Sequence, residues 1–218
     1  MKSIKVMITS IVLGLLSLIA TTAAIGSDSA GPTPIIESTT SQIMAIVGEA
    51  PKYFDTDPDR FYNEIGAALD ETIDWRGFAK GVMGDYASNA RYRSLDDSGR
   101  KALREQLESF TDIMKSGLIR TYAKGLLAFS GSKFEIVDDE TIDPDARSAS
   151  ITQLVYGSGD RTYTVRYQMG RSRDGSWRLR NLIVADINLG QIYQNQFAAA
   201  AKSADCLLYT SPSPRDRG

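Results

Sequence analysis

Five acidic side chains near the middle of the chain are the residues whose type and spacing could do chemistry. Asp138, Asp139 and Glu140 are consecutive, and Asp143 and Asp145 follow within the next five positions. Paired carboxylates serve as general acid and base, and carboxylate oxygens also bind Ca²⁺. The segment lies in a predicted loop between two strands, and its spacing differs from that of an EF-hand. It therefore predicts a solvated turn rather than a catalytic pair or a calcium site.

The remaining sequence supplies few of the groups on which catalysis usually depends. It contains no histidine, and its one cysteine, Cys206, lies in the terminal segment 206–218 that is excluded from the fold prediction below. The commonest general base and the thiolate chemistry are therefore missing. It also contains no nucleophile elbow, P-loop or dinucleotide-binding fingerprint. We therefore expect a protein that is not an enzyme and that uses neither a metal nor a cofactor.

Composition points to one folded domain and away from nucleic acids. The chain has 218 residues, of which 42% are hydrophobic, and this is enough to bury one sizeable core. Its net charge is −2, and basic residues such as those at 91–101 are interleaved with acids. A binding partner made of nucleic acid is not expected from this charge balance.

The two ends of the chain are expected to lie outside the folded domain. Residues 1–26 have a lysine-bearing start, an apolar run and a small-residue stretch, which is typical of a cleaved signal peptide. An uncleaved membrane anchor is the alternative, but the apolar run is short for a span. Residues 27–33 form a predicted linker, and 34–205 form a single α+β domain. Residues 206–218 resemble the translation of a transposase sequencing adapter and are excluded from the fold prediction.

The first half of the domain predicts helices. Apolar spacing predicts one helix over residues 34–48, and a second is predicted with Asp57 as its cap and Pro58 as its first residue. A glycine-punctuated segment covers 74–86, where close packing is the expected compensation for weakened helix propensity. The longest helix is predicted to start with a capping box over 94–97. Its apolar stripe consists of Leu103, Leu107, Phe110, Met114, Leu118, Tyr122 and Leu126.

The second half changes to strand periodicity. Four predicted strands cover residues 134–137, 148–156, 161–169 and 177–185, and a hairpin turn is predicted at Asp174-Gly175. Together with the helices, these strands predict an α+β fold in which a helical layer packs on a twisted antiparallel sheet of about four strands.

Apolar residues of the glycine-punctuated segment and the long helix allow two interpretations. They can fill an ordinary core, which helical spacing alone favours, or they can line a cavity. The residues concerned include Phe78, Met83, Tyr86, Met114, Tyr122 and Phe129.

Three segments resemble the MlaC family of periplasmic phospholipid-binding proteins, also known as the toluene-tolerance auxiliary component. They are FAKGVMGDY at 78–86, LIRTYAKGLLAF at 118–129 and the stretch 177–197, and the resemblance extends over about residues 34–201. It implies a deep apolar pocket that holds the acyl chains of a glycerophospholipid. It also implies transfer between an outer-membrane lipoprotein–porin complex and an inner-membrane ABC transporter complex with an MCE-domain subunit. The implied pocket residues are Phe78, Val82, Met83, Tyr86, Phe110, Met114, Leu118, Tyr122, Leu126, Phe129, Val165, Tyr167, Ile183 and Tyr193.

The closing segment departs from the family pattern at four positions. Asn181 stands where relatives have aspartate, Asp186 where they have glycine, Asn188 where they have serine and Gln194 where they have arginine. If relatives use that arginine for a phosphate contact, this chain lacks it.

Two other functions remain open from the sequence. One is a cone-shaped α+β periplasmic enzyme that uses an aspartate or a tyrosine inside a cavity. The other is a lipid-free structural adaptor whose apolar stripes only pack against one another.

Overall fold

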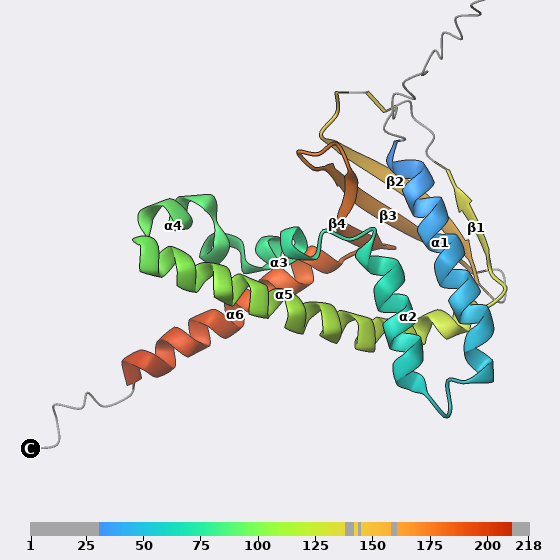
Figure 1. The fold of residues 1–218 in the computed structure, drawn as a ribbon, viewed down its shortest axis with the longest axis horizontal. Helices are drawn as coiled ribbons and strands as arrows, with labels where there is room; N and C mark the ends of the chain where they lie inside the picture. Colours follow the sequence, from blue (N-terminus) through green and yellow to red (C-terminus); the bar gives the residue numbers. More distant parts are fainter. Residues whose placement is uncertain (1–30, 138–141, 144, 158–160, 211–218) are drawn as a thin grey trace, which may run out of the picture.

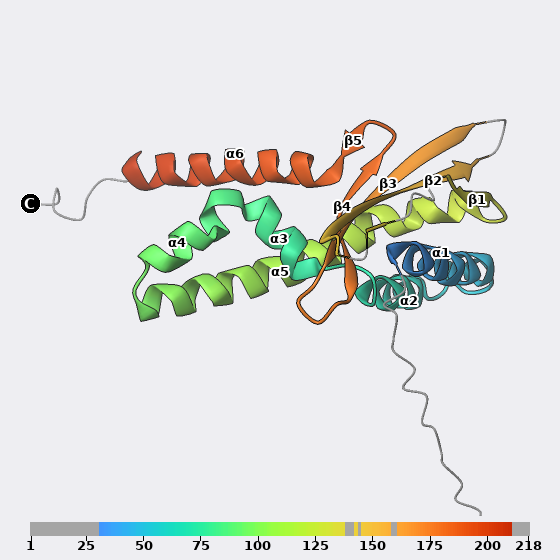
Figure 2. The ribbon, with the colours of Figure 1, turned by 90° about the horizontal axis from the view of Figure 1, so that it is seen from above.

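The computed structural model of the chain describes residues 31–137, 142–143, 145–157 and 161–210, with the backbone alone beyond Ser203. It is an α+β structure in which an antiparallel sheet lies beside a group of helices (Figure 1 and Figure 2). The helices are α1 (Pro32–Glu49), α2 (Pro58–Asp70), α3 (Trp75–Met83), α4 (Asn89–Ser94), α5 (Asp97–Leu126) and α6 (Leu189–Thr210), with the 3-10 turns η1 (Ala50–Lys52), η2 (Gly84–Ala87) and η3 (Leu127–Phe129). The strands are β1 (Lys133–Ile136), β2 (Ser148–Tyr156), β3 (Thr162–Arg171), β4 (Trp177–Val184) and β5 (Ile187–Asn188).

Helix α2 begins as its sequence predicts. The carboxylate of Asp57 accepts a hydrogen bond from the backbone nitrogen of Arg60 at 3.2 Å, and Pro58 is the first helical residue. Proline suits this position because its missing N–H would have no partner inside the helix.

The start of α5 differs from the prediction. The capping box expected over 94–97 is wrong, because Asp96 caps the helix and accepts from the backbone nitrogen of Gly99 at 2.7 Å. This hydrogen bond lowers the pKa of Asp96 from its ordinary value. Ser94 belongs to the preceding short helix, where its hydroxyl donates to the carbonyl of Arg91 at 2.8 Å.

The sheet is an antiparallel meander in the order β1-β2-β3-β4-β5, one strand more than the expected four. The additional strand, β5, has two residues, which is too short for an alternating pattern to reveal. The predicted hairpin between β3 and β4 is confirmed: Ser172 donates to the carbonyl of Ser176 at 2.8 Å, and Gly175 has a φ of +87°.

One irregularity interrupts the pairing of β3 with β4. Gln168 is opposite Asn181, whereas Met169 is opposite Leu179, so Arg180 is an extra residue on β4. Such a β-bulge places two successive residues of one strand on the same side of the sheet.

The link between α2 and α3 is tied to the edge of the sheet. Ile73 forms a parallel bridge with Leu179 of β4. Leu179 donates its backbone N–H to Thr72 at 2.8 Å and accepts one from Asp74 at 2.9 Å. The first turn of α3 is therefore held against β4 by backbone hydrogen bonds.

Helix α1 joins the sheet to the helices through two buried clusters. Near its start, Ile36 packs on the sheet with Ile151 of β2 and Trp177 of β4. Near its end, Val47 packs with Phe61 of α2 and Ile119 of α5.

The apolar stripe expected along α5 is only partly correct. Ile119 and Ala123, which lie off that stripe, are buried against α1 and α2, whereas Tyr122 is 46% exposed. The reason is that α5 changes its packing partners along its length, so that its buried face rotates. Within the described residues, no helix has both the length and the apolar content needed to cross a membrane.

Candidate functional site

The position of α3 depends on a tight cap at its first turn. Oδ1 of Asp74 accepts from the backbone nitrogen of Gly77 at 2.8 Å, and Oδ2 lies 3.6 Å from Nε of Arg180. Any Cβ at position 77 would collide with the Asp74 carboxylate. This close approach is the compensation that the sequence predicts for the glycine-punctuated segment.

Helices α3, α5 and α6 enclose an apolar cluster, which we call the three-helix cluster. Figure 2 shows α3 between the other two helices. The two aromatic side chains that α6 contributes to the cluster are Tyr193 and Phe197. The cluster contains eight of the fourteen residues predicted for the lipid pocket: Phe78, Val82, Met83, Tyr86, Phe110, Met114, Leu118 and Tyr193. It also contains Ala79, Ala87, Leu107 and Phe197, which the prediction omitted although the four-residue spacing from Tyr193 to Phe197 is helical.

Edge-to-face aromatic contacts join α6 to η2, which follows α3, and to α5. The ring of Phe197 lies edge-on to Tyr86 at 5.5 Å and edge-on to Phe110 at 5.3 Å between ring centroids. Such contacts contribute about 1 kcal/mol each beyond the area that they bury.

A pair of tyrosines connects α5 to α6 further along. The hydroxyl oxygens of Tyr122 and Tyr193 are 3.1 Å apart. Burial of Tyr193, followed by its hydrogen bond with Tyr122, raises the pKa of Tyr193 to about 12. Both causes favour the neutral phenol, so this group keeps its proton near neutral pH.

Asn181 builds the junction at which the last strands meet α6. Its Oδ1 accepts from the backbone nitrogens of Leu182 and Gly190, both at 2.9 Å, and its Nδ2 donates to Gln168 at 2.7 Å and Asn188 at 3.0 Å. A Cβ at Gly190 would lie only 2.6 Å from Oδ1 of Asn181. The sequence marks Asn181 only as a departure from the family pattern, and its structural role was not predicted.

Two further departures from the family pattern also make defined contacts. Oδ1 of Asn188 accepts from the backbone nitrogen of Gln191 at 3.0 Å and so caps the first turn of α6, as a serine would. Nε2 of Gln194 donates to the carbonyl of Gly81 on α3 at 3.3 Å. Ala185 turns the chain between β4 and β5 with a φ of +52°, which is uncommon for a residue other than glycine.

Two predicted pocket residues of β3 lie on the side of the sheet that faces the helices. Val165 is opposite Val184, and Tyr167 is opposite Leu182 and Ile151. The hydroxyl of Tyr167 donates to Oε1 of buried Gln153 at 2.8 Å. Burial raises the pKa of Tyr167, so its phenol also stays protonated.

The remaining predicted pocket residues are dispersed. Leu126 packs with the cluster formed by α1 and α2, and Phe129 meets the ring of Tyr163 edge-on at 5.6 Å. Ile183 is opposite Arg166 on β3, so it lies on the other side of the sheet from Val165. The structure therefore does not bring these three residues together with the three-helix cluster.

Two hollows are open to solvent at the surface of the described residues. One, of about 450 Å³, is lined by α5 alone, at Ala102, Glu105, Gln106, Ser109, Phe110 and Ile113. The other, of about 230 Å³, lies between α3, α4 and α5. Of the fourteen predicted pocket residues, only Phe110 lines either of these hollows.

The acidic segment 138–145, predicted as a solvated turn, is only partly described. Asp143 accepts from the backbone nitrogen of Asp145 at 2.8 Å, which makes a local turn. Asp138, Asp139 and Glu140 lie outside the described residues, as do the predicted signal peptide and most of the linker. Among the described residues, no group of three or more acidic, cysteine or histidine side chains could hold a metal ion.

A meander sheet lies beside a helical layer, and an apolar cluster fills the space between helices. These features define an α+β protein with an apolar interior. A model of the MlaC protein family matches residues 37–206, and the chain belongs to this family. The toluene tolerance protein Ttg2D of Pseudomonas putida is 27% identical over 191 residues, which cover 86% of this chain and 80% of that protein.

A solved structure has the same fold. The phospholipid-binding protein of Ralstonia solanacearum, determined in complex with a phospholipid, superimposes with a TM-score of 0.65 at 17% identity. The superposition covers 79% of this chain and 88% of that one. At this level of identity the likeness establishes the fold, and it agrees with the α+β class expected from the sequence.

Proposed function

We propose that this protein is a periplasmic carrier of glycerophospholipids that holds acyl chains between the helix-facing side of its sheet and its helical layer. The observation that carries the proposal is the set of half-buried apolar side chains on both elements: Val165, Leu182 and Val184 on the helix-facing side of the sheet, and Leu118 and Tyr193 in the three-helix cluster. Membership of the MlaC family and the fold shared with a phospholipid-binding protein support the same function.

Half-buried apolar side chains are present on both surfaces that would meet the acyl chains. On the sheet they include Val165, Leu182 and Val184, and on the helices they include Leu118 and Tyr193. A two-chain lipid carries roughly thirty methylene groups, and exposing them to water would cost on the order of 20 kcal/mol. A carrier must cover most of that surface, and such side chains provide the apolar contacts without any reaction.

The tyrosines of this region are poor candidates for catalysis. An enzyme that used Tyr193 as a general base would need a pKa near the working pH, whereas burial raises it to about 12. Asp74, the carboxylate at the start of α3, is already engaged by Gly77 and Arg180. These observations favour a carrier over the enzyme that the sequence left open.

The proposed partners are those implied by the family. Lipid would pass between an outer-membrane lipoprotein–porin complex and an inner-membrane ABC transporter with an MCE-domain subunit. The protein would need no resident cofactor, since the lipid is cargo.

Native mass spectrometry tests the proposal directly. The full chain is expressed with its N-terminal segment, recovered from the periplasmic fraction without detergent, and weighed intact before and after lipid extraction. A stoichiometric excess mass that extracts as phospholipid is the expected result, and recovery from this fraction supports the predicted export. A folded protein that stays empty after incubation with phospholipid vesicles would overturn the carrier function and favour the structural adaptor.

A further inference from the structure

The hollow between α3, α4 and α5 is lined by three basic side chains and no acidic one. Arg76 and Lys80 come from α3 and Arg104 comes from α5. The other lining residues are Ala87, Asn89, Tyr92, Leu103 and Leu107. The walls of the hollow are therefore positively charged, and its apolar lining includes Leu103 and Leu107, which are both buried.

Two of these three basic side chains donate to neutral groups instead of carboxylates. Nζ of Lys80 donates to Oδ1 of Asn89 at 2.7 Å, and Nη1 of Arg104 donates to the hydroxyl of Tyr92 at 2.7 Å. Within the described residues, neither of them nor Arg76 forms an ion pair within 4.0 Å.

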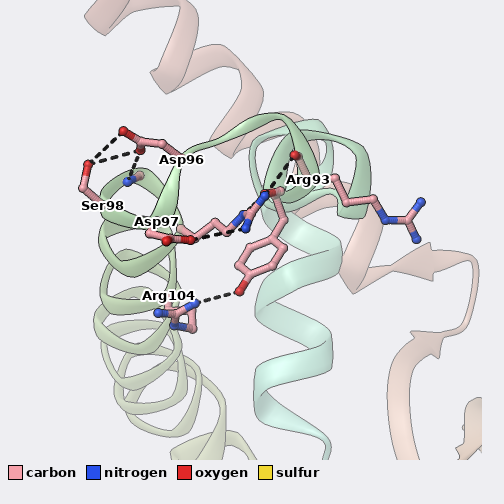
Figure 3. Close-up of polar contacts among 8 residues, drawn as sticks. Arg93, Asp96, Asp97, Ser98 and Arg104 are labelled. Carbon is pink, nitrogen blue, oxygen red and sulfur yellow. Dashed lines mark hydrogen bonds and ion pairs between the residues drawn. The ribbon is translucent and has the colours of Figure 1, made fainter.

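Two of the three aspartates of residues 76–104, Asp96 and Asp97, are engaged at the first turn of α5, and the third, Asp85, is an exposed residue of η2. Figure 3 shows Asp96 and Ser98 at the end of the helix and Arg104 further along it. Asp96 accepts from Ser98 and from the backbone of Gly99, and Asp97 lies 3.4 Å from Arg100. Within the described residues, neither of these two carboxylates forms an ion pair with a basic residue of the hollow.

Charge in this part of the chain is opposite in sign to that of the whole. Residues 76–104 contain seven lysines and arginines against three aspartates, a net charge of +4, whereas the full chain has −2. The remaining residues therefore carry −6. A local excess of one sign in a chain of the other sign concentrates counter-ions at that place.

From this geometry we propose that the hollow binds a phosphate group, such as the head group of a lipid at an anionic bilayer surface. Guanidinium groups match phosphate oxygens with paired donors, and a lysine ammonium adds a point charge. The hydroxyl of Tyr92 and the amide nitrogen of Asn89 can also donate, because their oxygens already accept from Arg104 and Lys80.

The shape of the hollow favours a compact tetrahedral anion over an acidic peptide. Its basic groups come from two helices and converge on about 230 Å³, which suits a single charged group better than an extended chain. The hollow shares Ala87 and Leu107 with the three-helix cluster, but none of its lining residues is on the sheet. The phosphate site does not require that the sheet side chains bind lipid.

The proposal is tested with a triple variant that removes the three positive charges of the hollow: Arg76→Gln, Lys80→Gln and Arg104→Gln. The variant is made in the full-length protein and recovered from the periplasm. One experiment measures flotation with vesicles of phosphatidylglycerol and phosphatidylcholine, and a second measures calorimetric binding of inorganic phosphate. We expect the variant to weaken binding by about tenfold, and we expect salt to weaken binding of the unmodified protein. The matched control removes the same charge from exposed positions elsewhere, through Lys124→Gln, Arg173→Gln and Lys202→Gln, and should bind normally.

The two probes distinguish the source of the phosphate. Loss of flotation in the triple variant assigns the hollow to lipid head groups, and loss of inorganic phosphate binding alone assigns it to a free phosphate. The proposal is overturned if the variant binds both probes normally, if the control loses as much, or if polyglutamate binds and neither phosphate probe does. The thermal unfolding midpoint of each variant confirms that it is folded. The mass of lipid carried by the triple variant tests the carrier proposal separately, because the variant can lose phosphate binding at the hollow and still carry lipid.

Discussion

Asn181 uses both atoms of its amide to connect β3, β4, β5 and α6. Replacing it with alanine removes four hydrogen bonds and leaves the backbone nitrogen of Gly190 without this acceptor. We expect Asn181→Ala to lower the free energy of unfolding by about 2 to 4 kcal/mol. Urea unfolding measures it, with Asn195→Ala as the control, because that exposed side chain accepts one bond, from Gln191. An effect no larger than that of the control would contradict the structural role.

Two helical glycines respond in opposite ways to the same substitution. At Gly190 an added methyl group would meet the Asn181 amide, whereas at Gly117, exposed on α5, nothing lies within 4 Å. Gly117→Ala should stabilise the protein by about 1 kcal/mol, because alanine has the higher helix propensity. Gly190→Ala should destabilise it, and thermal unfolding of the two variants gives the comparison. Stabilisation by both would show that the α6 junction can relax.

At the scale of the elements, the contact between α5 and α6 has a predictable pH dependence. The pKa of Tyr193 is about 12 in the folded protein, above the value of about 10 expected in the unfolded chain. The stabilisation linked to this proton is complete below about pH 10 and is lost as the pH rises towards 12.

Tyr193→Phe should therefore make the loss of stability above about pH 10 less steep. Urea midpoints measured across this range test it. Tyr163→Phe, which removes a hydroxyl from the sheet and keeps a ring beside Phe129, is the control. Equal slopes for the unmodified protein and Tyr193→Phe would contradict the assignment.

The two sides of the sheet should also differ in their effect on lipid. Val165→Trp places a large side chain on the side that faces the helices, whereas Ile183→Trp places one on the opposite side. Because acyl chains and the new ring would compete for the same space, we expect Val165→Trp to reduce the extracted phospholipid and Ile183→Trp to leave it unchanged. The amount of phospholipid per protein after periplasmic purification tests this prediction. A loss in Ile183→Trp alone would contradict it, because it would place the lipid on the side of the sheet that faces away from the helices.

For the molecule as a whole, features set by neighbouring residues could be predicted and features set by distant contacts could not. The cap at Asp57 and the turn at Asp174-Gly175 depend on a few adjacent residues, and both are confirmed. The burial of Ile119 in place of Tyr122 depends on which helices α5 meets, which helical spacing does not contain.

The candidate site shows the same division. Eight of the fourteen pocket residues implied by the family resemblance lie together in the three-helix cluster, and their contact with lipid stays a prediction. Ile183 was grouped with them although it lies on the far side of the sheet. Its neighbours Leu182 and Val184 are also apolar, so no alternation marks which of the three faces the helices, and the bulge at Arg180 shifts the count.

The extra residue at Arg180 interrupts the alternation of β4 in the sequence without changing which residues are paired on either side of it. Leu182 and Val184 lie on the side of the sheet on which α1 packs, and Asn181 points to the other side, where it meets the first turn of α6. Deleting Arg180 would remove the bulge and leave Leu179 opposite Met169 and Asn181 opposite Gln168, so Leu182 and Val184 would keep their side of the sheet. What the deletion would take away is the guanidinium beside the Asp74 carboxylate, at the first turn of α3.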